Sequence, residues 1–158
     1  MSESTMVTDL QGAFNAQLNA QIAAYKQDPR QLEGKELMWF LTWNCFALED
    51  ELHEAMGETG WKPWATSNHL NAEAFHGELV DAFHFFMNLC LASGLTVEKL
   101  FEGYNIKLQK NIQRQRDAYD GLNKCPKCRR ALDDDATTCN YNKDSGRGFC
   151  QEVGAFSG

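Results

Sequence analysis

Two pairs of acidic residues, each pair three residues apart, restrict how this chain can fold. Glu51 and Glu54 lie in one apolar segment, and Glu78 and Asp81 lie in the next. Because residues three apart share one face of an α-helix, each pair would project two carboxylates in one direction. Two antiparallel helices would bring the four acids together, and their charges would repel unless cations lay between them. The pattern therefore predicts a helical hairpin that binds Mg²⁺ or Mn²⁺, since both cations prefer oxygen ligands.

The alternative is that the acids face solvent on two amphipathic helices, as a single pair of this kind usually does. Exposed pairs do not need apolar neighbours. Here both helices are apolar beside the acids, at Leu48, Leu52, Ala55, Leu79, Val80, Phe83 and Phe86. This setting favours the metal site over the solvated face.

The composition is that of an ordinary globular chain of one domain with a small appendage. Of 158 residues, 43% are hydrophobic and 23% charged, which leaves enough apolar surface for a core. The formal charge of −7 argues against nucleic acid as a partner. No apolar run is long enough for a membrane span, and the N-terminus lacks the pattern of a secretory signal. We expect a cytoplasmic protein.

Hydrophobic spacing predicts an all-α body, a bundle of four to five helices. Four segments carry the helical period: 8–26, 35–58, 71–91 and 96–119. Thr8 or Asp9 is the expected cap of the first, and Gly94 is expected to end the third. The third segment is apolar around nearly its whole circumference, at Phe83, Phe85, Phe86, Met87, Leu89 and Leu91. We interpret this as burial against the bundle on one side and a second subunit on the other, giving a homo-oligomer, a dimer or a dimer of dimers.

Basic residues gather in the fourth helical segment. Lys107, Lys110 and Arg114 follow spacings of three and four, so they form a stripe on one helix face. A stripe of this kind usually faces solvent. Beside an acidic metal cluster, the alternative is that it holds the charged end of a polyphosphate.

The cysteines divide the chain into a body, 1–120, and a tail, 121–158. Cys45 and Cys90 lie in apolar helical segments and are expected to be buried thiols. The tail carries four cysteines that could complete one structural Zn²⁺ site, as in a small zinc ribbon: Cys125, Cys128, Cys139 and Cys150. The second pair has ten residues between its members where a ribbon usually has two, so a disulfide or a tail without metal stays open. A tail this short has little core of its own, which favours the metal.

Four short motifs follow one another along the chain. They are E-x-x-E at 51–54 followed after 23 residues by E-x-x-D at 78–81, G-W-K-P-W at 60–64, D-x-x-H-F at 81–85, and N-x-x-R-Q-x-x-x-Y at 111–119. Together they resemble the all-α nucleoside triphosphate pyrophosphatases, the MazG-like and dimeric dUTPase superfamily, and most of all its phage-borne members. The resemblance covers roughly residues 10 to 120, and the ordered set is more specific than any one motif.

The resemblance implies hydrolysis of a (deoxy)nucleoside triphosphate to the monophosphate and pyrophosphate. Family roles would place the four acids, Glu51, Glu54, Glu78 and Asp81, on catalytic Mg²⁺, with one of them also orienting the attacking water. The phosphates would be held by Lys62, Lys110, Asn111 and Arg114. Phosphoryl transfer depends on metal, positioning and charge neutralisation, so these residue types suit the reaction.

The base is expected to lie between the first helix and the 61–64 loop. Trp61 and Trp64 would supply an aromatic surface for stacking. Dimeric dUTPases typically carry Gln and Asn four apart on the first helix to read uracil, and the corresponding residues here are Asn15 and Asn19. This departure leaves the substrate open between dUTP and a purine nucleotide such as dGTP or GTP, on which some phage relatives act.

A different class of function fits the same sequence less well. The zinc knuckle and the basic stripe could bind nucleic acid or protein, with the acidic helices serving only as a scaffold. Four acids beside two tryptophans favour the enzyme. Release of pyrophosphate from a nucleotide would separate the two interpretations.

Overall fold

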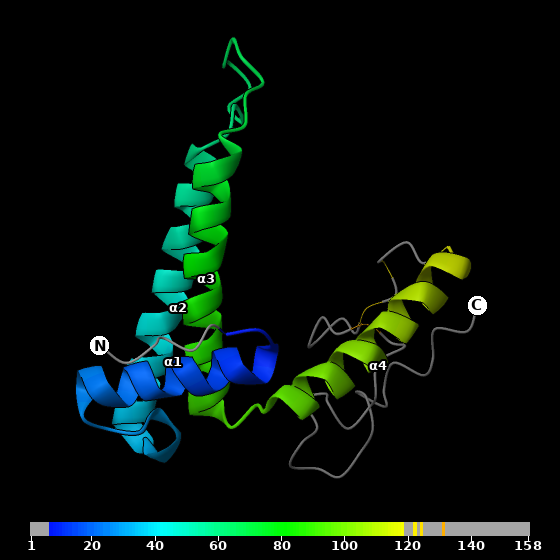
Figure 1. The fold of residues 1–158 in the computed structure, drawn as a ribbon. Helices are drawn as coiled ribbons and strands as arrows, with labels where there is room; N and C mark the ends of the chain where they lie inside the picture. Colours follow the sequence, from blue (N-terminus) through cyan, green and yellow to red (C-terminus); the bar gives the residue numbers. More distant parts are fainter. Residues whose placement is uncertain (1–6, 119–121, 123, 125–130, 132–158) are drawn as a thin grey trace. The chain divides into compact units, whose positions relative to one another are not determined.

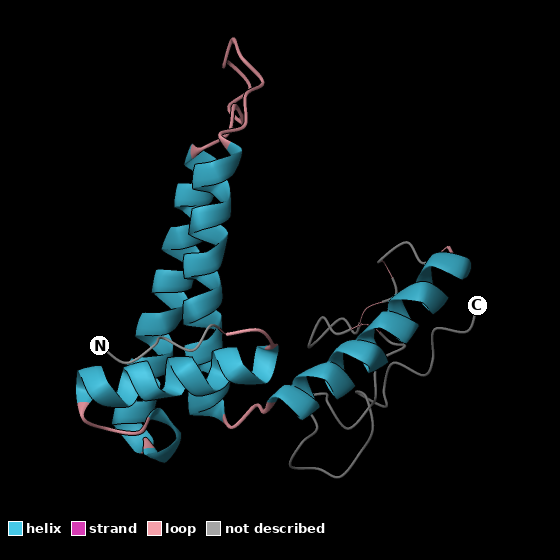
Figure 2. Cartoon of the chain, in the orientation of Figure 1, coloured by secondary structure: helices cyan, strands magenta, loops and turns pink. Residues whose placement is uncertain are grey.

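The fold is given by a computed structural model, which describes residues 7–118 together with 122, 124 and 131. The chain divides into two compact units, Met1–Tyr104 and Asn105–Gly158. The described residues form four α-helices, one 3₁₀ turn and two isolated β-bridges, and they contain no longer strand (Figures 1 and 2). The all-α class predicted from the sequence is confirmed.

The first helix, α1 (Leu10–Tyr25), begins where the sequence predicts. Asp9 is its N-cap, and the Asp9 carboxylate accepts a hydrogen bond from the Gly12 backbone N–H at 2.7 Å. This bond satisfies one of the N–H groups that the first helical turn leaves without a partner. The chain then passes through the 3₁₀ turn η1 (Pro29–Gln31), where Asp28 and Arg30 form an ion pair at 2.6 Å.

The long helices α2 (Gly34–Gly57) and α3 (Ala72–Ser93) pack side by side as an antiparallel hairpin (Figure 1). The buried and partly buried side chains of α2 recur every three or four residues along one seam, which faces α3. Helices with this spacing pack with nearly parallel axes, so each turn of one meets a turn of the other. The predicted hairpin is confirmed, and both pairs of acids lie on it.

A loop of fourteen residues, 58–71, closes the hairpin and is fixed at its base. Thr59 and Leu70 form an antiparallel bridge, and the Gly60 backbone N–H donates to His69 O at 2.9 Å. A Cβ on Gly60 would lie 2.1 Å from the Ser67 carbonyl oxygen, so this position excludes every side chain. The loop beyond this bridge presents Trp61, Lys62 and Trp64.

Helix α3 ends at Gly94, as predicted. Gly94 adopts the left-handed conformation with φ of 73°, and its N–H bonds to the Cys90 and Leu91 carbonyls. The Thr96 hydroxyl then accepts from the Lys99 N–H at 3.3 Å and caps α4 (Val97–Arg116). A glycine and a threonine two residues apart therefore end one helix and begin the next.

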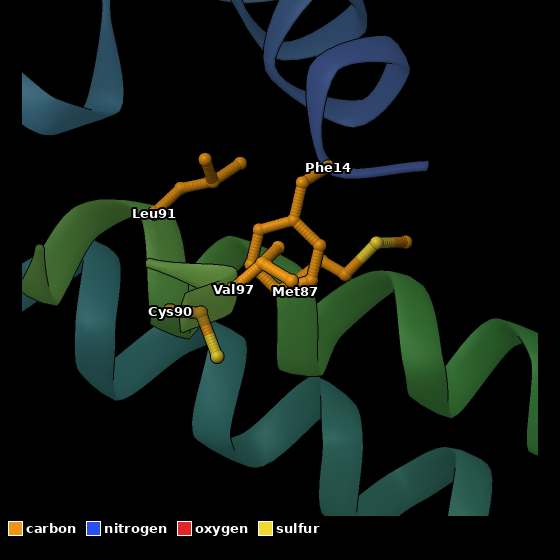
Figure 3. Close-up of a cluster of buried hydrophobic side chains, with 5 residues drawn as sticks. All are labelled: Phe14, Met87, Cys90, Leu91 and Val97. Carbon is orange, nitrogen blue, oxygen red and sulfur yellow. The ribbon is translucent and has the colours of Figure 1, made fainter. Parts of the chain in front are cut away.

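The core lies where α1 crosses the hairpin near the C-terminal end of α3. Figure 3 shows its five buried side chains: Phe14, Met87, Cys90, Leu91 and Val97. Burial raises the pKa of the Cys90 thiol, which is therefore a neutral core residue. Cys45, expected to be buried, is exposed instead, because it lies on the face of α2 that points away from the seam.

No single helix of the described chain is long and apolar enough to cross a membrane. The bent pair α3 and α4 passes the same test of length and composition, which buried core helices also pass. In the second unit, Lys124 and Ala131 form an isolated antiparallel bridge.

Candidate functional site

Three of the four predicted acids come together near the loop end of the hairpin. One carboxylate oxygen from each of Glu51, Glu54 and Glu78 lies within 4.8 Å of the others. Glu51 and Glu78 are partly buried on the facing sides of α2 and α3, whereas Glu54 and Asp81 are exposed. The chain thus concentrates negative charge from two helices in a space that suits a cation with oxygen ligands.

The convergence of the acids disfavours the ionised form of Glu51. Its pKa is raised above the ordinary value, first by desolvation and then by the charges of Glu54, Asp81 and Glu78, with a side-chain hydrogen bond to Glu78 also contributing. Asp81 is therefore close enough to act on Glu51 although it is outside the converging trio. Removing a carboxylate from water beside like charges disfavours its ionised form. A divalent cation would reverse this effect, so the four acids fit a metal site.

Glu58, one turn beyond Glu54, has a different role. Its carboxylate accepts from the Asn71 side-chain amide at 2.8 Å, and its backbone carbonyl accepts from the Asn71 N–H at 2.9 Å. These bonds join the two ends of the loop. Glu58 therefore holds the hairpin closed next to the acids.

The residues predicted to bind the base do not form one pocket within a subunit. Trp61 and Trp64 are 54% and 76% exposed on the loop, whereas α1 crosses the hairpin at its opposite end (Figure 1). Asn15 accepts from Gln11 at 3.1 Å and lines a cavity of about 390 Å³ beside Arg30. Asn19 is exposed on α1. A pocket between α1 and the loop would need a loop from another subunit.

The remaining predicted site residues are divided among the loop of the first unit, the second unit and the part of the chain outside the described residues. Lys110 and Arg114 are partly buried on α4, one turn apart on the same face, and Asn111 is exposed. Lys62 is exposed on the loop of the first unit. The four cysteines assigned to Zn²⁺ lie outside the described residues: Cys125, Cys128, Cys139 and Cys150.

A chain of amides that the sequence analysis missed links three helices. The Gln17 side chain on α1 donates to Asn88 Oδ1 at 2.8 Å, and the Asn88 amide donates to Asn44 Oδ1 at 2.9 Å. The Asn44 amide in turn donates to the Phe40 carbonyl at 2.8 Å. We call Gln17, Asn88 and Asn44 the amide relay. Its signal in the sequence is a polar residue seven positions before Glu51 and another seven positions after Asp81, each in an apolar helix.

Comparisons with known proteins identify the family. The family model of dUTPase matches residues 5–99, which include α1, the hairpin and the acids. The dCTP pyrophosphatase of Enterobacteria phage LZ5 is 26% identical over 115 residues, covering 58% of this chain and 67% of the relative. The dCTP pyrophosphatase of Enterobacteria phage T4 is 40% identical over 42 residues, covering 27% of this chain and 25% of the relative. No solved structure matches the chain.

This chain is an enzyme of the nucleoside triphosphate pyrophosphatase class, and enzymes of this class are hydrolases. Its helical hairpin and acids fit this class. The chain belongs to the dUTPase family. This result supports the coarse part of the resemblance drawn from the motifs and leaves the base to be assigned.

Proposed function

We propose that this enzyme hydrolyses a pyrimidine deoxynucleoside triphosphate, dUTP or dCTP, to the monophosphate and pyrophosphate with Mg²⁺. The observation that carries the proposal is the convergence of Glu51, Glu54 and Glu78 on two antiparallel helices. The family is that of dUTPase, and the two phage relatives are dCTP pyrophosphatases by name. These names favour a pyrimidine over the dGTP or GTP that the sequence analysis left open.

Within this proposal, the four acids would hold Mg²⁺ or Mn²⁺ through carboxylate oxygens. The chemistry that the metal supplies when bound is neutralisation of negative charge on the phosphate oxygens. One carboxylate would orient the attacking water and accept its proton as the bond to phosphorus forms. Lys62, Lys110, Asn111 and Arg114 are the proposed phosphate ligands, since lysine and arginine pair readily with phosphate oxygens.

We propose that the enzyme works as a homo-oligomer. Large apolar side chains follow the spacing of four and three on the outer face of α2, where Trp39 is 65%, Trp43 41% and Phe46 66% exposed. Trp39 stacks on Trp43 with ring centroids 6.5 Å apart, so these rings form one continuous surface. A helix with a second apolar stripe suits packing against a copy of itself. We name this face of α2, formed by Trp39, Trp43 and Phe46, the outer stripe.

The tail is proposed to hold one structural Zn²⁺ through Cys125, Cys128, Cys139 and Cys150. Four thiolates close the coordination sphere and leave no position for substrate. The tail would therefore contribute stability and not chemistry.

A nucleotide panel tests the proposed function. The full-length protein is incubated with Mg²⁺ and each of dUTP, dCTP, dTTP, dATP, dGTP and GTP, and pyrophosphate and monophosphate are measured together. We expect both products in equal amounts, fastest with dUTP or dCTP. Release of inorganic phosphate without pyrophosphate, or no turnover of any nucleotide, would overturn the proposal, and a preference for dGTP or GTP would overturn its pyrimidine part.

A further inference from the structure

The polarity of the amide relay assigns a role to a residue outside the acidic cluster. We propose that Gln17 Oε1 is a fixed hydrogen-bond acceptor that reads an N–H donor on the Watson–Crick edge of the substrate base. This inference rests on the proposed nucleotide hydrolysis and adds how the base is selected. Its argument depends on the direction of each hydrogen bond along the relay, on the accessibility of Gln17 Oε1, and on its register with the acids.

The direction of the relay is set at its buried end. The Phe40 backbone carbonyl can only accept, so Asn44 must turn its Nδ2 toward Phe40 and its Oδ1 toward Asn88. Asn88 must then present Nδ2 to Asn44 and Oδ1 to Gln17, and Gln17 must present Nε2 to Asn88. Rotating the Gln17 amide by half a turn would place two oxygens against each other. Burial makes that mismatch costly, because Asn44 is 0% and Asn88 2% exposed.

The other end of the relay is open. Gln17 is partly buried, and its Oε1 accepts no hydrogen bond from any residue that the structure describes. The buried polar side-chain atoms without a partner in the described chain include only Gln21 Oε1, so Gln17 Oε1 is in contact with solvent. A glutamine that is free to rotate can present either an acceptor or a donor. Here the relay holds the acceptor outward.

The register of the hairpin places Asn44 and Asn88 of the relay two helical turns from the acids. Asn44 precedes Glu51 by seven residues, and Asn88 follows Asp81 by seven, so each pair shares one face of its helix. Seven residues of α-helix span roughly 10.5 Å. This is comparable with the span of a nucleotide from its α-phosphate to the far edge of its base. Gln17 reaches the hairpin at Asn88, so a base extended from phosphates at the acids would meet its oxygen.

A fixed acceptor selects a base by the donor that the base offers. The amino group on C4 of cytosine and the N3–H of uracil are the two such donors on the Watson–Crick edge of a pyrimidine. A carbonyl oxygen or an unprotonated ring nitrogen at the same place would face Gln17 Oε1 as a second acceptor. A site built to pair one hydrogen bond rejects an analogue that lacks it, because the polar group of the protein is left without a partner.

The experiment compares substrates that differ by one donor. We would measure kcat/KM with Mg²⁺ for dCTP against its analogue with hydrogen in place of the amino group, and for dUTP against N3-methyl-dUTP, in which a methyl group replaces the hydrogen on N3. For the wild-type enzyme, one of the two analogues should lose about tenfold to a hundredfold, and that analogue names the donor being read. Gln17→Met keeps the length of the side chain. In this variant, that analogue and its parent nucleotide should have kcat/KM values within about threefold of each other.

Two further variants separate reading from folding. Gln21→Met makes the same change one turn along α1, outside the relay, where Gln21 lines a separate cavity with Tyr25 and Trp39. It should discriminate between the analogues as the wild type does. The double variant Asn44→Leu and Asn88→Leu leaves Gln17 in place but free to rotate, and its discrimination should fall as in Gln17→Met.

The outcomes are distinct for the two proposals. If the wild type hydrolyses none of the nucleotides, the proposed function fails and this inference falls with it. If the wild type hydrolyses dCTP or dUTP but treats both analogues as it treats the parent nucleotides, only the role of Gln17 is overturned. Wild-type discrimination in Gln17→Met would overturn it equally, whatever the effect on the absolute rate.

Discussion

The Asn88 side-chain amide donates to Asn44 Oδ1 across the α2–α3 hairpin at 2.9 Å, and both residues are almost fully buried. Buried amides paired in this way fix the register of two helices, because a shift of one turn would leave Asn88 Nδ2 and Asn44 Oδ1 without each other. Seven residues from this pair, the same register sets Glu51 opposite Asp81. The pair that aligns the hairpin therefore also aligns its acids.

The first prediction concerns this pair. Asn44→Leu leaves the Asn88 amide without its acceptor, and we expect the free energy of unfolding to fall by about 1 to 3 kcal/mol. Replacing both residues with leucine removes the unpaired group, so the double variant should recover part of that loss. Urea denaturation of the four proteins of this cycle measures the coupling. Simple additivity of the two single changes would show that the two amides act independently.

The second prediction concerns the acids. Glu54→Gln and Asp81→Asn each remove one charge with little change in volume, so turnover should fall by at least about a hundredfold while the circular dichroism spectrum stays that of the wild type. Without metal, both variants should melt higher than the wild type because one repulsion is removed. Glu36→Gln, on α2 far from the cluster, is the matched control. Wild-type rates in either acidic variant would exclude the cluster as the catalytic site.

The third prediction uses the raised pKa of Glu51. Because its folded pKa exceeds the ordinary value of 4.5, Glu51 binds a proton more tightly in the folded state. Its contribution to stability is complete below pH 4.5 and is lost as the pH rises through the folded pKa. In EDTA, melting temperatures measured from pH 4 to 8 should show this loss for the wild type and a smaller one for Glu51→Gln. Equal slopes for the two proteins would show that Glu51 is not strained by its neighbours.

Local signals in the sequence were sufficient to predict where helices begin and end. Asp9 caps α1, Gly94 ends α3 and Thr96 caps α4, and each acts through a side-chain or backbone geometry that depends on its near neighbours alone. The spacing of Glu51 with Glu54, and of Glu78 with Asp81, likewise placed four acids on one hairpin. Such features can be predicted because three or four residues determine them.

The predictions that were wrong concern features that depend on how the helices cross. The sequence does not show that α1 packs at the end of the hairpin opposite the loop, so the expected pocket between Asn15 and Trp61 is absent from the described chain. The hydrogen bond of Gln17 could not be predicted because its partner Asn88 lies on another helix. Cys45 was expected inside because its neighbours are apolar, but the outer stripe that makes them apolar is exposed. Apolar residues on two faces of α2 cannot be assigned to a core or to an interface by periodicity alone.

The fourth prediction concerns the tail. Native mass spectrometry should find about one Zn²⁺ per chain, as a closed site of four thiolates requires. A variant with Cys125 and Cys128 replaced by serine should lose the metal and keep its rate with the best nucleotide. If the wild-type protein carries no zinc and these two thiols react freely with iodoacetamide, the site is excluded without affecting the catalytic proposal.

The last prediction joins the oligomer to the base pocket. Because α1 and the 61–64 loop lie at opposite ends of one hairpin, Asn15 and Trp61 can share a base only if they come from different subunits. An oligomer made only of Asn15→Ala subunits, or only of Trp61→Ala subunits, should have a lower kcat/KM than the wild type. In a two-fold dimer, a mixed pair contains one site with both changes and one with neither, so random mixing of the two variants should restore about a quarter of the wild-type activity. Trp43→Glu in the outer stripe should abolish this recovery and convert the protein to monomers in sedimentation velocity. Mixtures whose rate equals the average of the two variants, while the oligomer is intact, would show that each base lies within a single subunit.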